Sequence, residues 1–146
     1  MYVQDVMKKK VVTCREKDSL KKCADLMREW KIGMLPVVDA KHQLVGVVTD
    51  RDLVVRGIAE GRPLTAEACD VMTKRLVTCR DGDELWFAEE RMAAERKSRI
   101  LVVDDARHVV GVISLSDIPL SDEGPRASEL LRQVARREAA PRPERH

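Results

Sequence analysis

The sequence repeats itself at a fixed spacing of 65 residues, and this internal repeat constrains the fold more strongly than any single motif. Residues 5–53 align with residues 70–118 without a gap, and 18 of the 49 aligned positions are identical. The clearest matches are Asp5-Val6-Met7 with Asp70-Val71-Met72, Val12-Thr13-Cys14-Arg15 with Val77-Thr78-Cys79-Arg80, Val37-Val38-Asp39 with Val102-Val103-Asp104, and Val45-Gly46-Val47 with Val110-Gly111-Val112. We therefore expect two copies of one supersecondary unit, with function carried by the polar residues that both copies keep.

Each copy shows the same order of predicted elements, β-α-β-β-α, which indicates an α/β fold. In the first copy, Ser19 is a predicted N-cap, and apolar residues then follow at helical spacing. That face consists of Leu20, Cys23, Met27 and Trp30. Gly33 is predicted to end the helix. The predicted strands of this copy are 11–14, 34–38 and 44–48, and its second helix runs from 50 to about 59.

The second copy repeats this pattern, with strands 76–79, 99–104 and 108–113, a helix over 84–97 and another helix starting near Ser114. A connector over 57–66 contains two glycines and Pro63. The predicted domain organisation is a first repeat over 1–60, a second repeat over 61–120 and a charged tail over 121–146. Part of the tail, 127–140, is predicted to be a short helix, and its last six residues are predicted to be disordered.

Size and charge restrict the class of protein. At 146 residues one compact domain is expected, and because a unit of about 50 residues is marginal alone, the two copies are expected to share a core. Lys and Arg exceed Asp and Glu by only two, 27 against 25, which argues against nucleic-acid binding. The one basic cluster, Lys8-Lys9-Lys10 with Lys74-Arg75, is read as solvated loops. No apolar run is long enough to span a membrane, and no signal peptide is recognised.

The cysteines support a reducing, cytoplasmic location. Cys14 and Cys79 are repeat partners, whereas Cys23 and Cys69 are not, and no Cys-x-x-Cys pair is present. We read the four thiols as small, half-buried hydrophobes. A zinc site or a redox pair remains the alternative, and no metal ligands are assigned.

The pattern Gly-h-h-[Ser/Thr]-x-x-Asp, where h is apolar, follows the third strand of each copy. It reads Gly46-Val-Val-Thr49-Asp-Arg-Asp52 in the first copy and Gly111-Val-Ile-Ser114-Leu-Ser-Asp117 in the second. The pattern places a hydroxyl and a carboxylate on the first turn of a helix, where free N–H groups favour an anion. The carboxylate is suited to accept hydrogen bonds from the two hydroxyls of a ribose. The alternative is an ordinary capping box that satisfies the amides of the helix itself.

These features together resemble CBS domains, the repeats named after cystathionine β-synthase. The resemblance covers about residues 3–120 and rests on the paired β-α-β-β-α units, the Asp-Val-Met openings, the apolar-Pro-Val-Val-Asp strand and the repeated Gly-h-h-[Ser/Thr]-x-x-Asp pattern. It implies a tandem pair, or Bateman module, packed about a pseudo-twofold axis with a short C-terminal helical tail. Such modules sense adenosine-containing ligands such as AMP, ADP, ATP, NAD or S-adenosylmethionine in clefts between the copies, and are usually not enzymes.

The resemblance also implies two binding sites, each with the ribose on the motif Asp and phosphates near the Ser or Thr. The residues of the first implied site are Thr49, Asp52, Arg51, Val12, Thr13, Met34, Leu35 and Pro36. The residues of the second are Ser114, Asp117, Val77, Thr78, Arg99, Ile100 and Leu101. Leu101 stands where the family has the Pro that the first copy keeps as Pro36, and Leu115-Ser116 replace Asp50-Arg51, so the two sites are expected to differ in affinity.

The leading hypothesis is a regulatory module that senses an adenosine nucleotide and signals through its conformation or through a partner protein. The alternative is a scaffold with vestigial nucleotide sites. Histidine is scarce, with three residues, and no Walker-type loop is present, so no catalytic residues are assigned. Trp86 and Phe87 stand where the first copy has Lys21 and Lys22. They are interpreted either as local packing or as the interface of a homodimer.

Overall fold

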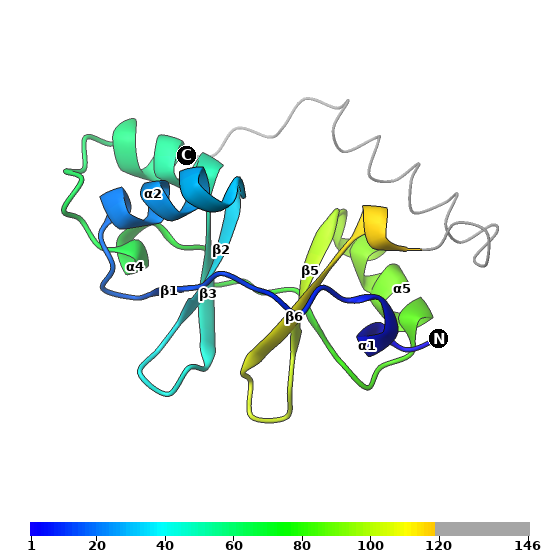
Figure 1. Cartoon of the computed structure of the whole chain (residues 1–146). Helices are drawn as coiled ribbons and strands as arrows, with labels where there is room; N and C mark the ends of the chain where they lie inside the picture. The colour runs from blue at the N-terminus through cyan, green and yellow to red at the C-terminus, as the bar shows by residue number, and fades with distance from the viewer. Residues whose placement is uncertain (119–146) are drawn as a thin grey trace. The chain divides into compact units, whose positions relative to one another are not determined.

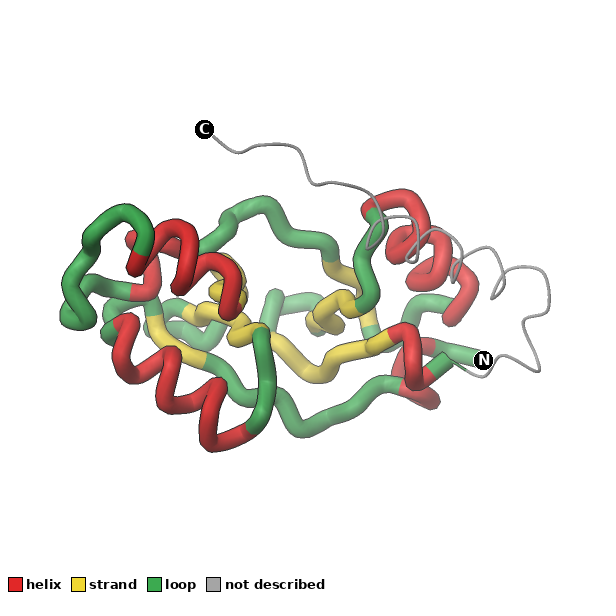
Figure 2. The backbone as a smooth tube through the Cα atoms, turned by 90° about the horizontal axis from the view of Figure 1, so that it is seen from above, coloured by secondary structure: helices red, strands yellow, loops and turns green. Residues whose placement is uncertain are grey.

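The computed structural model describes residues 1–118, which form a mixed α/β fold with two three-stranded sheets. The predicted tail helix and the tail boundary over 121–146 lie outside the described residues. The chain divides into two compact units. Unit A is our name for 10–76 with 105–109, and unit B for 1–9, 77–104 and 110–118. The helices and strands of both units are shown in Figures 1 and 2.

The sheet of unit A consists of β1 (Cys14–Arg15), β2 (Met34–Val38) and β3 (Leu44–Thr49), in that order. β1 runs parallel to β2, with Cys14 opposite Val37. β2 and β3 form an antiparallel hairpin that pairs Met34 with Thr49. This pairing brings the start of β2 to the residue that opens the Thr49 motif.

The helices of unit A are α2 (Leu20–Trp30), α3 (Asp50–Asp52) and α4 (Ala68–Val71), together with a π-helical stretch, η1 (Leu53–Ile58), that continues α3. The predicted N-cap of α2 is confirmed, because Ser19 Oγ accepts a hydrogen bond from the Lys22 amide at 3.0 Å. Leu20, Cys23 and Met27 are buried as predicted.

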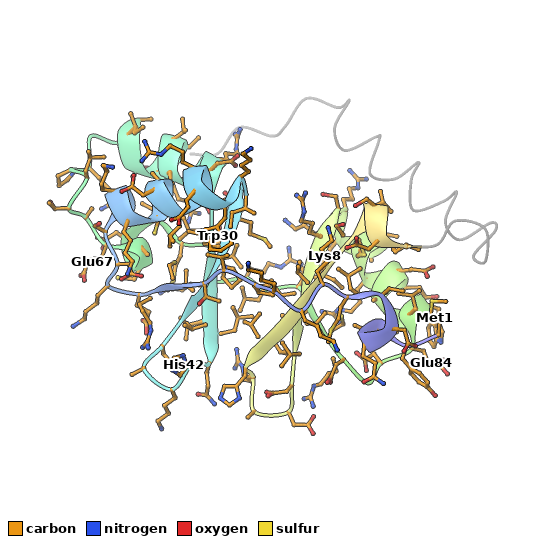
Figure 3. All side chains as sticks on the ribbon, in the orientation of Figure 1. Met1, Lys8, Trp30, His42, Glu67 and Glu84 are labelled. Atoms are coloured by element: carbon orange, nitrogen blue, oxygen red, sulfur yellow. The ribbon has the colours of Figure 1, made fainter. Side chains whose placement is uncertain are left out.

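Two details of α2 were predicted wrongly. Trp30 is 42% exposed, and its ring lies 4.3 Å from Lys10 Nζ instead of in the core; both residues belong to unit A, and Trp30 is labelled in Figure 3. The helix ends at Lys31, which adopts a left-handed conformation with φ 54°, and not at Gly33. A basic residue at this position also interacts favourably with the negative end of the helix dipole.

Unit B has the same arrangement. Its sheet consists of β4 (Thr78–Arg80), β5 (Arg99–Val103) and β6 (Val109–Ser114), with β4 parallel to β5. Only the first residue of β6, Val109, is grouped with unit A. Its helices are α1 (Val3–Val6) and α5 (Leu85–Glu95), and the helix predicted at Ser114 is a 3-10 turn, η2 (Leu115–Asp117).

The segment that opens each repeat packs with the sheet of the other repeat. α1 belongs to unit B, where the Val3 amide donates to the Asp83 carbonyl at 2.9 Å. α4, the equivalent helix 65 residues later, belongs to unit A, where the Ala68 amide donates to the Asp18 carbonyl at 2.7 Å. Figure 1 shows α1 beside α5. The boundaries 1–60 and 61–120 therefore remain a prediction about sequence repeats, and the packed units are built differently.

One buried cluster fills each unit, and the two clusters use equivalent positions. Val3 and Ala68, which are 65 residues apart, are fully buried in unit B and unit A respectively. Met7 packs on Gly111 and Met72 packs on Gly46 in the same way, since a Cβ placed on either glycine would lie 2.6 Å from the methionine Sδ. This close approach explains why both copies keep Gly in the middle of a strand.

Candidate functional site

The Thr49 turn of unit A is the first predicted site. The Thr49 amide donates to Asp52 Oδ2 at 3.1 Å, and Thr49 Oγ1 accepts from the Asp52 amide at 3.1 Å. The capping box that the sequence left open as an alternative is therefore present. Thr73 Oγ1 also lies 3.4 Å from the same oxygen, Asp52 Oδ2.

Capping does not use the whole carboxylate of Asp52. Asp52 is only 4% exposed, yet each of its contacts from described residues is made to Oδ2, and its Oδ1 accepts no hydrogen bond from that part of the chain. A buried carboxylate is costly unless its oxygens are hydrogen-bonded. Oδ1 is thus the atom of this turn that is suited to accept a ligand hydroxyl.

The Ser114 turn of unit B has the same backbone arrangement with different side-chain contacts. The Ser114 amide donates to Asp117 Oδ2 at 3.1 Å. The Ser114 hydroxyl donates to this same oxygen at 3.0 Å and lies 2.7 Å from Ser116 Oγ. The remaining oxygen, Asp117 Oδ1, lies 3.6 Å from Lys8 Nζ. Both oxygens of Asp117 therefore have protein partners.

The two turns are fixed at equivalent places in their units. The Asp50 amide donates to the Gly33 carbonyl at 2.9 Å, and 65 residues later the Leu115 amide donates to the Ser98 carbonyl at 2.8 Å. Each bond ties the motif turn to the residue just before β2 or β5. Met34 and Arg99, which open these strands, therefore lie next to the motif turns.

The predicted adenine-contacting residues divide into buried and accessible positions. Leu35, Pro36, Ile100 and Leu101 are buried, and Leu35 and Ile100 are core residues of their units. Because their side chains are packed inside the protein, only the backbone groups of these residues are able to contact a ligand. The more accessible predicted residues are Val12, Thr13, Met34, Arg51, Val77, Thr78 and Arg99.

Sequence reasoning missed Lys8 and Thr73, which contact the motif carboxylates from outside the motif. The two residues are repeat equivalents, each directly after the matched Asp-Val-Met segment. A signal was present in the sequence: the residues on both sides of this position are identical in the two copies, whereas the position itself is charged in one copy and neutral in the other. The sequence analysis instead read Lys8 as part of a solvated loop. Figure 3 labels Lys8 in unit B.

The cysteines lie in the cores and not at these turns. All four are free thiols, and Cys14, Cys23 and Cys79 are buried. Burial raises the pKa of Cys79 to about 12. In unit A, a hydrogen bond to Cys23 together with burial raises the pKa of Cys14. Among the described residues no group of three or more His, Cys, Asp or Glu side chains is arranged to hold a metal ion.

The family model for the CBS domain matches residues 3–57 and again residues 68–118. The chain belongs to the CBS-domain family. Both matches contain one complete Gly-h-h-[Ser/Thr]-x-x-Asp motif, so each CBS repeat supplies one of the two turns described above. In residues 1–118, no helix is long and apolar enough to cross a membrane.

The chain is similar to a protein of comparable length and to part of a much longer enzyme. The Bacillus subtilis (strain 168) protein YlbB is 33% identical over 122 residues, which cover 83% of this chain and 82% of YlbB. Inosine-5'-monophosphate dehydrogenase of Methanocaldococcus jannaschii is 36% identical over 124 residues, which cover 85% of this chain and only 24% of the enzyme. The similarity to that enzyme therefore covers only a minor part of its length.

Two solved structures are similar to this chain in fold. The CBS domain pair of protein MJ0100, solved in complex with 5'-methylthioadenosine and S-adenosyl-L-methionine, is 26% identical with a TM-score of 0.70, covering 80% of this chain and 95% of that one. Hypoxic Response Protein I, solved with two coordinated zinc ions, is 26% identical with a TM-score of 0.73, covering 82% of this chain and 100% of that one.

Proposed function

We propose that this CBS-domain pair is a regulatory module that binds an adenosine-containing ligand through Asp52 and Asp117, and that it is not itself an enzyme. The observation that carries the proposal is the Thr49 turn, in which Asp52 Oδ2 holds the backbone while Oδ1 accepts no hydrogen bond from the described residues. The complex of the similar MJ0100 pair with two adenosyl compounds supports this ligand class.

In this proposal the ribose hydroxyls donate to the motif carboxylates, and the ligand class includes AMP, ADP, ATP, NAD, S-adenosylmethionine and 5'-methylthioadenosine. The accessible residues of the first site are Thr49, Arg51, Met34, Val12 and Thr13, and those of the second are Ser114, Arg99, Val77 and Thr78. Ligand binding is then transmitted as a change of conformation or of affinity for an effector protein in the cytoplasm, a location with which the four free thiols agree.

The experiment that tests this function is isothermal titration calorimetry of the full chain with each of these compounds. Asp52→Asn and Asp117→Asn remove one charge each from the motif carboxylates. Asp50→Asn is the matched control, because Asp50 is exposed in the same turn and only caps the Arg51 amide, at 2.8 Å. We expect binding in the wild type, loss of at least tenfold in affinity at the altered site, and no comparable loss in the control.

Absence of binding to every compound, with the protein folded and shown by mass spectrometry to carry no ligand from purification, would overturn the proposal. The scaffold alternative would then be favoured. Binding that both motif variants leave unchanged would keep the ligand class but reject the assignment of Asp52 and Asp117.

The proposal includes a homodimer formed through α5. Trp86 and Phe87 are 39% and 38% exposed, and their rings pack edge to face with centroids 6.1 Å apart. The equivalent Lys21 and Lys22 of α2 instead form ion pairs with Asp25 and Asp18. Exposed aromatic pairs of this kind are typical anchors of protein interfaces.

Sedimentation velocity over a range of concentrations tests the dimer. Phe87→Ala combined with Trp86→Ala is expected to shift a wild-type dimer to monomer, and Lys21→Ala with Lys22→Ala on the equivalent face of α2 is the matched control. A monomeric wild type, or a dimer that the aromatic substitutions leave intact, would reject α5 as the interface.

A further inference from the structure

The position that follows Asp-Val-Met is held against the motif strand in both units. In unit B, the Lys8 amide donates to the Val112 carbonyl and the Val112 amide donates to the Lys8 carbonyl, each at 2.9 Å. In unit A, Thr73 and Val47 form the same pair of bonds at 2.8 and 3.0 Å. In each unit the backbone of this residue is thus fixed beside the strand that ends at the motif, and its side chain lies next to the motif carboxylate.

The chemistry delivered to the carboxylate differs between the units. Thr73 offers a neutral hydroxyl to Asp52 Oδ2, the oxygen that already caps the turn. Lys8 offers an ammonium to Asp117 Oδ1, the oxygen that capping leaves open. A ribose hydroxyl at the second site therefore has to compete with a cation for Oδ1, whereas at the first site it does not.

Lys8 is free to leave this ion pair. Its side chain is 68% exposed, against 15% for that of Asp117, and the bonds that fix Lys8 involve only its backbone. An exposed ion pair is weak, so a ligand with a negative charge within reach can draw the ammonium away from Asp117. An uncharged ligand supplies nothing to hold the ammonium once it has been displaced.

The motif turn of unit B, residues 114–117, contains no cationic residue, and the cation already placed next to it is Arg99 at the start of β5. The equivalent of Arg51 in this turn is Ser116, whose hydroxyl lies 2.7 Å from Ser114 Oγ. Lys8 therefore supplies the positive charge that the second motif lost, from a different segment of the chain.

We infer that Lys8 makes the Asp117 site selective for adenosine ligands that carry a phosphate, and that the uncharged nucleoside binds there more weakly. This inference rests on the proposed function and adds a ligand class for one of its two sites. On binding, the ammonium moves from Asp117 Oδ1 to the phosphate, and the ribose hydroxyl takes its place on the carboxylate. The Asp52 site, faced by Thr73, has no such selection from this position.

The test compares adenosine with AMP by calorimetry in a chain that carries Asp52→Asn, so that Asp117 is the remaining motif carboxylate. Lys8→Thr installs the residue found at the equivalent position of unit A. Lys9→Thr is the matched control, because it removes the same charge from the neighbouring exposed residue. Thermal unfolding of each variant verifies that it is folded.

We expect Lys8→Thr to strengthen adenosine binding about two- to fivefold, the weight of an exposed ion pair, and to weaken AMP binding by a similar factor. The preference for AMP over adenosine then falls by about fourfold or more, and Lys9→Thr leaves it near the parent value. The reciprocal Thr73→Lys in a chain with Asp117→Asn is expected to weaken adenosine binding at the Asp52 site.

An unchanged preference in Lys8→Thr, or an equal fall in Lys9→Thr, would overturn this inference and leave the proposed function standing. The same holds if the Asp52→Asn chain binds neither compound while the wild type binds. If the wild type binds neither adenosine nor any of the phosphate-bearing compounds, the proposed function and this inference fall together.

Discussion

Unit A and unit B share the same backbone arrangement down to single hydrogen bonds, but they differ in the groups that surround the carboxylate of the Gly-h-h-[Ser/Thr]-x-x-Asp motif. The methionine that packs on Gly46 and the one that packs on Gly111 approach to the same 2.6 Å. Asp52 and Asp117, by contrast, face a hydroxyl and an ammonium. The comparison shows that the two copies are alike in the backbone and in the Met–Gly contact, whereas the side chains that contact the motif carboxylates differ.

The largest expected effect is on core packing. Met27 and Met92 are equivalent, but Met27 is 8% exposed and Met92 is fully buried. Truncation of a buried Met to Ala costs about 2–5 kcal/mol, and we expect Met92→Ala to lie higher in this range than Met27→Ala. Urea unfolding measures the free energy of unfolding of both variants. A larger loss in Met27→Ala would contradict the interpretation that unit B is packed more tightly around α5 than unit A is around α2.

The next largest loss of stability is expected from the contact between a motif strand and the segment that opens a repeat. We call these two opening segments, which contain α1 and α4, the exchanged segments, because each packs with the sheet of the other repeat. Gly46→Ala and Gly111→Ala each force a methionine to move, and overpacking of this kind costs about 1–3 kcal/mol. We expect the two losses to be equal within error because the contacts are equivalent. Gly82→Ala is the control, since a Cβ there meets nothing within 4 Å. Clearly unequal losses would show that the two units do not hold their exchanged segments alike.

A smaller effect is expected from the motif caps in the absence of ligand. Loss of a capping side chain costs about 1 kcal/mol. Asp52→Ala is expected to lose more than Asp117→Ala, because Asp52 is buried and also contacts Thr73. Thermal unfolding of the two variants measures the difference. Equal losses would show that the burial of Asp52 and its Thr73 contact add no more stability than the contacts of Asp117 with Lys8 and the Ser114 hydroxyl.

The smallest effect is a pH dependence from Cys79. Because its folded pKa is raised to about 12 from an ordinary value of 9.0, the folded state holds this proton more tightly than the unfolded chain. The stabilisation is full below pH 9 and is lost as pH rises toward 12. Between pH 9 and 10 we expect a loss of up to about 1 kcal/mol.

Denaturant unfolding at a series of alkaline pH values measures this loss, and Cys79→Ala should show a shallower dependence. A slope that is the same in Cys79→Ala and in the wild type would assign the effect to other groups. Cys69, which is only partly buried in unit A, provides a comparison variant.

The long elements could be predicted from the sequence, because strong hydrophobic periodicity determines them. Ser19 and the face of α2 are examples, and Trp30 failed only because it lies in the last turn, where the face leaves the core. α1 and α4 could not be predicted, since four residues are too few to show a period. The π-helical stretch after Asp52 likewise has no signature in the pattern.

The motif turns were predicted as local structures, and their hydrogen bonds agree with the capping box that the spacing indicated. The approach of Lys8 and Thr73 could not be predicted, because it depends on which sheet each opening segment packs against. Neighbourhood in sequence favours the segment's own copy, whereas the structure places it on the other. The sequence shows that the equivalent residues Lys8 and Thr73 differ in charge, but it does not show that they contact Asp117 and Asp52.

The exchange of opening segments also has a consequence for synthesis on the ribosome. Residues 3–8 emerge before the strand that Lys8 pairs with, which contains Val112, so more than a hundred further residues must be synthesised before the native partner of this segment exists. Contacts of such long sequence separation slow folding. Until then, the apolar face of the first segment is exposed, and the nascent chain passes through a stage at which chaperone binding would be advantageous.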